Sequence, residues 1–279
     1  MQDDYVDVDH AGRTIKTRYW QAGAAGSAVV CVHGLGGYVE NWELTIPALA
    51  AQHRVYALDL VGFGYTEKPD VDYSLHYLAG FVQAFMHALD LEEASIIGHS
   101  LGGAITLQLA LLHPESVHKL VLVSSGGFGR EVAGLFRVLS LPLLGELLFH
   151  PTKKAIARGL KVAFYDERHI TPERIERGYK MATLSGLTHT TLNTIRTSTN
   201  MRGFKPEAID PILNHLDKVL MPSLTIWGKQ DAAVPVTHAE VAQQRLPDCQ
   251  SHIFEECGHW PQIEHSMAFN QLVVDFLMD

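Results

Sequence analysis

Apolar residues recur along the chain in short continuous runs, and between these runs they follow the three- and four-residue spacing of helices. Runs of this length are typical of parallel strands covered on both faces, and regular alternation of strand and helix predicts a parallel sheet with right-handed crossovers. The runs are AVVCVHG, RVYALDL, SIIGHS, KLVLVSS, PSLTIWG and SHIFEEC. The helical segments are 41–52, 75–90, 101–114, 236–246 and 265–278.

Two segments near the start, YVDVD and RTIKTRYW, alternate between apolar and polar residues instead, which predicts half-exposed antiparallel strands. The whole pattern therefore predicts an α/β fold, with a mostly parallel central sheet of about eight strands flanked by helices.

The alternation stops between residues 128 and 212, where no convincing strand is found. Helical patterns fill this region instead, at 130–149, 151–164, 171–186 and 187–200. We interpret residues 128–212 as a helical cap inserted after the sixth strand and carried over the sheet. Residues 1–127 and 213–279 then form the core domain.

The charge balance limits the partners of the chain. Its 279 residues include 31 Asp and Glu against 22 Lys and Arg, a net charge of −9 with histidine neutral. An acidic surface argues against nucleic acid and against anionic membranes as partners. We expect a small molecule as the partner, no nucleic acid and no membrane, and a homodimer is compatible with the sequence.

The three cysteines do not form a disulfide framework, because Cys31 lies within an apolar run and Cys249 and Cys257 flank one predicted strand. The first ten residues are acidic and lack the apolar region of a secretory signal. No stretch reaches the roughly 20 apolar residues of a membrane span. We expect free thiols and a cytoplasmic location.

The segment GHSLGG places Ser100 where a strand pattern stops and a helix pattern begins. It fits the G-x-S-x-G nucleophile elbow, in which a strained turn exposes the serine hydroxyl above the sheet, and the glycines let the backbone bend tightly. The alternative is a helix N-cap serine with glycines for close packing. The strand before it and the helix after it favour the nucleophile.

A nucleophilic serine needs a base, and the base needs an acid that orients it. Asp231 follows the strand pattern PSLTIWG, although alone it could be a turn residue. The other usual place for the acid, after KLVLVSS, has no carboxylate. His259 follows the last strand; His265, on the following helix, is its nearest competitor. The order serine, acid, histidine is that of a nucleophile-elbow hydrolase.

The negative oxygen of a tetrahedral intermediate also needs backbone N–H donors. The first candidate is Leu101, which follows the nucleophile. The second is Leu35, in the loop HGLGG at 33–37, where glycines allow the backbone to approach a substrate. By itself that loop could equally be a plain glycine turn.

Together these motifs resemble the α/β-hydrolase family, whose landmarks HGLGG, DLVGFGYT, GHSLGG, GKQD and CGHW span nearly the whole chain. The resemblance implies a Ser100–Asp231–His259 triad, an oxyanion hole from Leu35 and Leu101, and a cap at 128–212. It implies a two-step reaction through an acyl-enzyme, with no metal or organic cofactor. Since the elbow carries serine and not a carboxylate, epoxide opening and dehalogenation are disfavoured.

Two segments, CGHWPQIEHSMAFNQLVVDFL and AFYDERHITPERIERGYKM, look similar to the C–C hydrolases that cleave ring-fission dienones. Three departures stand against that activity. The oxyanion loop lacks the proline typical of those enzymes, His99 stands where they carry asparagine, and Gly178 stands where they carry a cap arginine. Arg177 lies one position earlier, which turns its side chain by about 100° on a helix.

We therefore predict a carboxylesterase for small to medium apolar esters, with dienone C–C hydrolysis as the alternative and a ligand-binding homologue as the least favoured interpretation. The cap is rich in leucine and phenylalanine, from which we expect an apolar pocket. The predicted substrate-binding residues are Gly34, His99, Phe128, Leu135, Leu139, Leu143 and Trp260.

Overall fold

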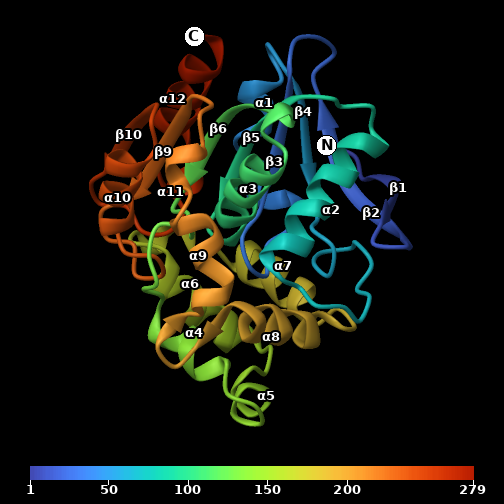
Figure 1. Ribbon diagram of the computed structural model, residues 1–279. Coiled ribbons are helices and arrows are strands. Elements are labelled where there is room, and N and C mark those ends of the chain that lie inside the picture. Colours follow the sequence, from blue (N-terminus) through green and yellow to red (C-terminus); the bar gives the residue numbers. More distant parts are fainter.

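A computed structural model describes residues 1–279 and shows an eight-stranded sheet in the order β1-β2-β4-β3-β5-β6-β9-β10 (Figure 1). β1 and β2 are antiparallel to their neighbours, and the other strands are parallel. This confirms the predicted fold class. The strands are β1 Asp4–His10, β2 Arg13–Ala22, β3 Ala28–Val32, β4 Arg54–Leu58, β5 Ala94–His99, β6 Val117–Val123, β9 Ser223–Gly228 and β10 Cys249–Phe254.

Helices cover both faces of the sheet, as the continuous apolar strands require. Alternate residues of one strand enter different apolar layers: Val30 packs with the layer under α2 (Leu75–Ala88) and α3 (Leu101–Leu112), whereas Cys31 packs with the layer under α12 (Ser266–Met278). α10 (Thr237–Arg245) joins the first layer, and α1 (Ile46–Leu49) joins the second. The helix expected over 41–52 is shorter than predicted, since a 3₁₀ turn, Val39–Trp42, precedes the four residues of α1.

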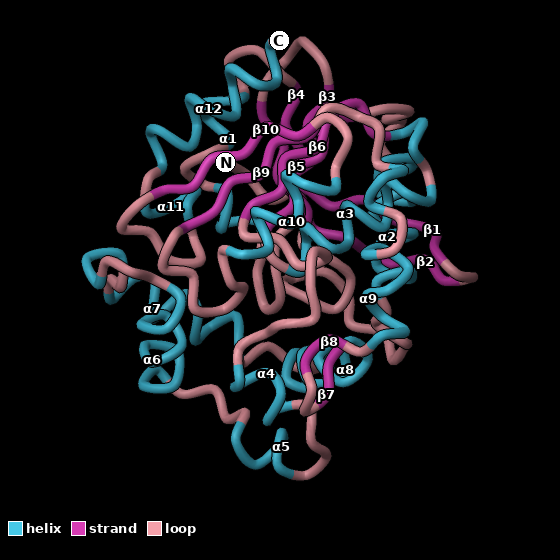
Figure 2. The backbone as a smooth tube through the Cα atoms, turned by 60° about the vertical axis from the view of Figure 1, so that its left-hand side comes forward, coloured by secondary structure: helices cyan, strands magenta, loops and turns pink.

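The segment after β6 leaves the sheet and lies beyond the carboxyl ends of its strands (Figures 1 and 2). Its helices are α4 Gly134–Leu139, α5 Leu144–Leu148, α6 Lys153–Ala163, α7 Pro172–Ala182 and α8 Leu187–Ser198. A short hairpin, β7 Thr199–Asn200 and β8 Gly203–Phe204, follows α8, so this region is not entirely free of strand. α9 (Pro206–Leu213) then returns the chain to the core, and α11 (Pro261–Glu264) precedes α12.

The helix predicted over 130–149 is broken into α4 and α5. Pro142 has no N–H and disfavours the helical conformation of the residue before it, and Leu143 adopts a positive φ of 66°. The break changes the direction of every side chain that follows. None of the helices is both long enough and apolar enough to cross a lipid bilayer.

Candidate active site

Ser100 occupies a sharp turn between β5 and α3, with φ 57° and ψ −117°. Such a conformation is costly for a residue with a side chain and persists only where its surroundings hold it. The Ser100 N–H donates to the Val123 carbonyl (2.9 Å), and its own carbonyl accepts from the Gly126 N–H (3.0 Å). The next turn packs closely, because a Cβ on Gly102 would lie 2.3 Å from the Val32 carbonyl oxygen.

Asp231 and His259 meet beside this turn. The Asp231 carboxylate accepts a hydrogen bond from His259 Nδ1 at 2.7 Å, and its other oxygen accepts the N–H groups of Ala233 (2.8 Å) and Val234 (3.0 Å). Both side chains are largely buried. Because an ionised carboxylate only accepts, Nδ1 carries the hydrogen and Nε2 keeps a lone pair, which is the tautomer that a general base needs.

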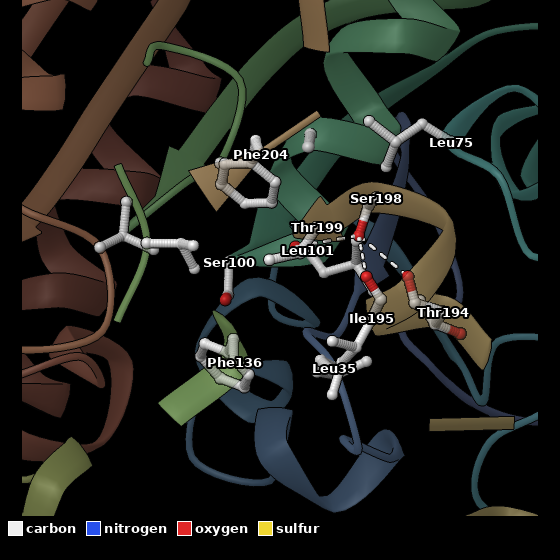
Figure 3. A pocket seen from close by; sticks show the side chains of 14 residues that line it. Leu35, Leu75, Ser100, Leu101, Phe136, Thr194, Ile195, Ser198, Thr199 and Phe204 are labelled. Carbon is white, nitrogen blue, oxygen red and sulfur yellow. Dashed lines mark hydrogen bonds between the residues drawn. The ribbon is translucent and has the colours of Figure 1, made fainter. Parts of the chain in front are cut away.

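The structure thus brings together all three residues that the sequence pattern singled out at the carboxyl edge of the sheet. The Ser100 hydroxyl forms no hydrogen bond to His259 here and points into the pocket (Figure 3). Contacts of this kind commonly tighten when a substrate binds. His265, the competing histidine, instead stacks on Phe254 with its ring centroid 4.8 Å away.

Leu35 and Leu101 line the same pocket as Ser100, and neither backbone N–H donates a hydrogen bond within the protein. Free N–H groups beside a nucleophile are what an oxyanion hole offers. Glycine is needed at position 34, since a Cβ there would lie 2.9 Å from the Ser100 Cβ. Two of the predicted substrate-binding residues, Gly34 and His99, therefore lie at the serine.

His33 fixes the oxyanion loop, a role that the sequence did not indicate. Its Nδ1 donates to the Gly34 carbonyl (2.7 Å), and its Nε2 accepts the Leu60 N–H (3.0 Å). Complete burial lowers the pKa of His33 to about 4, so the ring is neutral near pH 7 and can accept as well as donate.

The pocket at Ser100 encloses about 540 Å³, part of it open to solvent. Its walls come from both layers: Leu35 and Leu101 from the core, Phe136 and Ile195 from the cap, and Phe204 from the hairpin (Figure 3). Thr194, Ser198 and Thr199 also line it, but the hydroxyls of Thr194 and Ser198 donate to the carbonyls of Thr190 and Thr194 in their own helix. The predicted apolar pocket exists, but other residues form it.

Four of the predicted substrate-binding residues do not line the pocket at Ser100. Leu135 and Leu143 are 56% and 84% exposed, because α4 turns Phe136 inward and the break at Pro142 points Leu143 outward. Leu139 is buried against Leu192 within the cap, and Phe128 packs edge-on against Trp227 in the core.

An aromatic row extends from the elbow to the cap. The His99 ring lies 4.5 Å from Trp260, and Trp260 stacks on Phe164 at 6.0 Å. His99 Nε2 donates to the His259 carbonyl at 2.8 Å, and burial holds the pKa of His99 well below its usual range. His99 thus supports the backbone of His259 as a neutral ring, and Trp260 packs against His99 without lining the pocket at Ser100.

Glu264 joins the cap to the loop that carries His259. One of its oxygens accepts the Gly258 N–H (2.8 Å), and the other accepts the N–H groups of Tyr165 (2.8 Å) and Asp166 (3.0 Å) from the cap. The His259 N–H also donates to the Ala163 carbonyl at the end of α6 (2.7 Å). Nothing in the sequence indicated this clamp, because its partners are backbone groups from a distant segment.

Two arginines of α7 differ in their partners. Arg177 forms an ion pair with Glu43 (2.7 Å). Arg174 lies over the Phe164 ring at 5.4 Å, and its side chain forms no hydrogen bond or ion pair. Partial burial lowers the pKa of Arg174 from its ordinary value, and the attraction of Glu43, which pairs with Arg177, offsets only part of this effect.

The fold, the elbow serine and the Asp231–His259 pair define a serine hydrolase with an α/β-hydrolase core. The chain belongs to the alpha/beta hydrolase fold family, whose model matches residues 27–266. It is 32% identical over 274 residues to the 2-hydroxymuconate semialdehyde hydrolase of Pseudomonas sp. strain CF600, covering 95% of this chain and 91% of that protein.

A second relative is the 2-hydroxy-6-oxo-6-(2'-aminophenyl)hexa-2,4-dienoic acid hydrolase of Metapseudomonas resinovorans, 33% identical over 272 residues, with 94% and 88% of the two chains covered. Among solved structures, the meta-cleavage product hydrolase from Pseudomonas fluorescens IP01 matches with a TM-score of 0.82 and 28% identity over 98% and 97% of the chains. The predicted resemblance to C–C hydrolases is confirmed, and these relatives favour that class over carboxylesterases.

Proposed function

We propose that this protein hydrolyses a C–C bond in an anionic 2-hydroxy-6-oxo-dienoic acid. Ser100, Asp231 and His259 act as the triad, and the N–H groups of Leu35 and Leu101 bind the oxyanion. The named relatives support this reaction class. The carboxylesterase predicted from the sequence becomes the second candidate.

In the proposed reaction, His259 Nε2 takes the proton of Ser100, whose oxygen attacks the 6-oxo carbon. The two free N–H groups stabilise the oxyanion. The bond to the neighbouring carbon then breaks, and its electron pair passes into the conjugated chain in its 2-oxo tautomer. His259 returns the proton to that fragment. Water hydrolyses the acyl-enzyme, so the products are a carboxylic acid and a shorter 2-hydroxydienoic acid.

The observation that carries the proposal is Arg174. The half-buried guanidinium forms no hydrogen bond within the protein, and its Nε is buried without a partner, which is costly unless a ligand such as an anion completes it. It lies at the cap end of the aromatic row that starts at His99, next to the nucleophile. With the substrate carboxylate held there, the guanidinium would also stabilise the negative charge that moves toward that end of the substrate during cleavage.

The test compares Arg174→Gln with Arg177→Gln on two substrates, 2-hydroxy-6-oxo-6-phenylhexa-2,4-dienoate and p-nitrophenyl butyrate. We expect Arg174→Gln to lower kcat/KM for the dienoate roughly a hundredfold, the usual scale for an uncompensated buried charge, with less than about a threefold effect on the uncharged ester. Arg177→Gln, which breaks a partly exposed ion pair, should change both by less than about threefold. A dienoate rate unaffected by Arg174→Gln would contradict this role.

Ester hydrolysis remains the second candidate because the pocket at Ser100 is lined mainly by apolar side chains such as Phe136, Ile195 and Phe204. The same triad and oxyanion donors serve an ester, whose alcohol leaves more readily than a carbon fragment. Wild-type turnover of p-nitrophenyl esters without dienoate cleavage would favour this candidate over the C–C hydrolase.

A further inference from the structure

The outer surface of the cap carries an apolar ridge that has no partner in the chain. Leu143, Leu144, Leu147 and Leu148, here called the leucine ridge, are 84%, 36%, 68% and 52% exposed. Leu144, Leu147 and Leu148 lie on α5, with Leu144 and Leu148 four residues apart on one face, and Leu143 immediately precedes the helix. Single exposed leucines are ordinary, but four neighbouring ones mark an interaction surface.

The ridge is held outward by the opposite face of α5. Gly145 is buried there, and a Cβ on it would lie 2.5 Å from the Leu139 carbonyl oxygen. Glu146 forms a two-point ion pair with Arg196 of α8, with both distances 2.7 Å. α5 lies at the end of the cap farthest from the sheet (Figures 1 and 2). The ridge therefore faces away from the active-site pocket and cannot serve it.

The segment that contains the ridge is basic in sequence, although the whole chain is acidic. Between residues 134 and 165 the only acidic residue is Glu146, already paired with Arg196, against five basic residues, of which Lys153 and Lys161 pair with Glu176 and Glu167 of neighbouring segments. Those five are Arg137, Lys153, Lys154, Arg158 and Lys161. Lys154 and Arg158 are exposed on α6 and form no ion pair.

The other flank of the ridge is basic as well. One surface cavity is lined by Pro142, just before the ridge, together with Met201, Arg202 and Lys205 from the hairpin region. Met201 is 52% exposed, and neither Arg202 nor Lys205 forms an ion pair. Unpaired cations thus lie beside Pro142 on the hairpin side and on α6, the helix that follows the ridge in the chain.

We propose that the tip of the cap docks peripherally on an anionic lipid surface. The leucine ridge enters the boundary between headgroups and acyl chains, and the flanking cations contact lipid phosphates, as in interfacial helices. A symmetric contact with a second copy would bring the same cations against one another, so self-association is disfavoured. The expectation of no membrane partner rested on the net charge of the chain, which averages over this basic end. The proposal does not depend on which bond the enzyme cleaves.

The test is co-sedimentation of the full chain with vesicles of phosphatidylcholine alone or mixed with phosphatidylglycerol. We expect binding to the mixed vesicles, weakened by added salt, and little binding to the neutral ones. The double variant Leu147→Gln/Leu148→Gln should weaken binding roughly tenfold or more, and Lys154→Gln/Arg158→Gln roughly tenfold or more. The matched control is Leu220→Gln, which changes a leucine that is 70% exposed elsewhere and should leave binding unchanged.

Hydrolysis of a soluble substrate by each variant verifies that its fold is intact, since none of these positions lines the pocket. No binding to anionic vesicles, equal binding to neutral ones, or binding retained by both double variants would overturn the proposal. So would a concentration-dependent dimer that the leucine variants abolish, because the ridge would then be an interface between copies.

Discussion

Replacing Glu264 by glutamine tests whether the cap holds the catalytic histidine in place. Glu264 accepts N–H groups from Gly258 on one side and from Tyr165 and Asp166 on the other. A glutamine side chain offers one carbonyl oxygen and one NH₂ group, so it can accept on only one side. On the other side its NH₂ would face backbone donors, and those contacts would be lost.

The size of the effect follows from these contacts. One retained bond changes from charged to neutral, and one or two partly exposed N–H groups lose their acceptor, which together cost about 2–3 kcal/mol. For a chain of this length the entropy of unfolding is about 0.6 kcal/mol per kelvin, so the Tm should fall by about 4 °C.

Activity should fall more than stability alone explains, because Gly258 adjoins His259. A displacement of the imidazole by about 1 Å typically costs about a hundredfold in rate, so we expect kcat to fall by about 10- to 100-fold. KM should change little, since Glu264 does not line the pocket.

Steady-state kinetics and thermal melts of Glu264→Gln should be compared with those of Glu255→Gln. Glu255 lies on the loop between β10 and α11 and makes an exposed ion pair with Lys229 (2.7 Å), so its loss should cost less than about 1 kcal/mol and leave kcat unchanged. A Glu264→Gln enzyme with a lower Tm but kcat within about twofold of wild type would refute the positioning role. The clamp would then stabilise the cap without orienting the histidine.

Three further predictions follow from the site. Ser100→Ala should lower kcat at least about a thousandfold while the far-UV circular dichroism spectrum stays unchanged. Activity near that of the wild type would exclude Ser100 as the nucleophile. Folding lowers the pKa of His33 from 6.5 to about 4, so its contribution to stability is complete above pH 6.5 and falls by up to about 3 kcal/mol as the pH drops to 4. The lowered pKa of His99 acts in the same direction. Urea unfolding at pH 7 and pH 5 should show the lower free energy of unfolding at pH 5. Phe136→Ala should shift the acyl-chain preference on p-nitrophenyl esters, whereas Leu143→Gln should not. Equal shifts in the two variants would indicate that Leu143 also lines the pocket.

The sheet and the three chemical residues could be predicted because each depends on a local pattern. Ser100 and Asp231 follow apolar strands and His259 follows the partly exposed edge strand β10, and parallel strands bring their carboxyl ends to one edge. The lining of the pocket could not be predicted in the same way. Phe136 and Leu135 differ by one position, about 100° on a helix, and the composition of the cap does not say which one faces inward. Contacts such as that of Glu264 depend on backbone groups about a hundred residues away.

The two arginines of α7 show how the structure changes a functional conclusion drawn from the sequence. Arg177 adjoins Gly178, where the resembling C–C hydrolases carry their arginine, and its shifted direction argued against a substrate with an acidic group. Arg174 lies four residues before Gly178 and therefore on the same face of the helix. In the structure Arg177 pairs directly with Glu43, whereas Arg174 forms no direct ion pair and lies over Phe164. Arg174 thus lies one turn away from position 178 but on the same face of α7. The absence of arginine at position 178 is therefore no argument against an anionic substrate, and the half-buried, unpaired Arg174 is an argument for one.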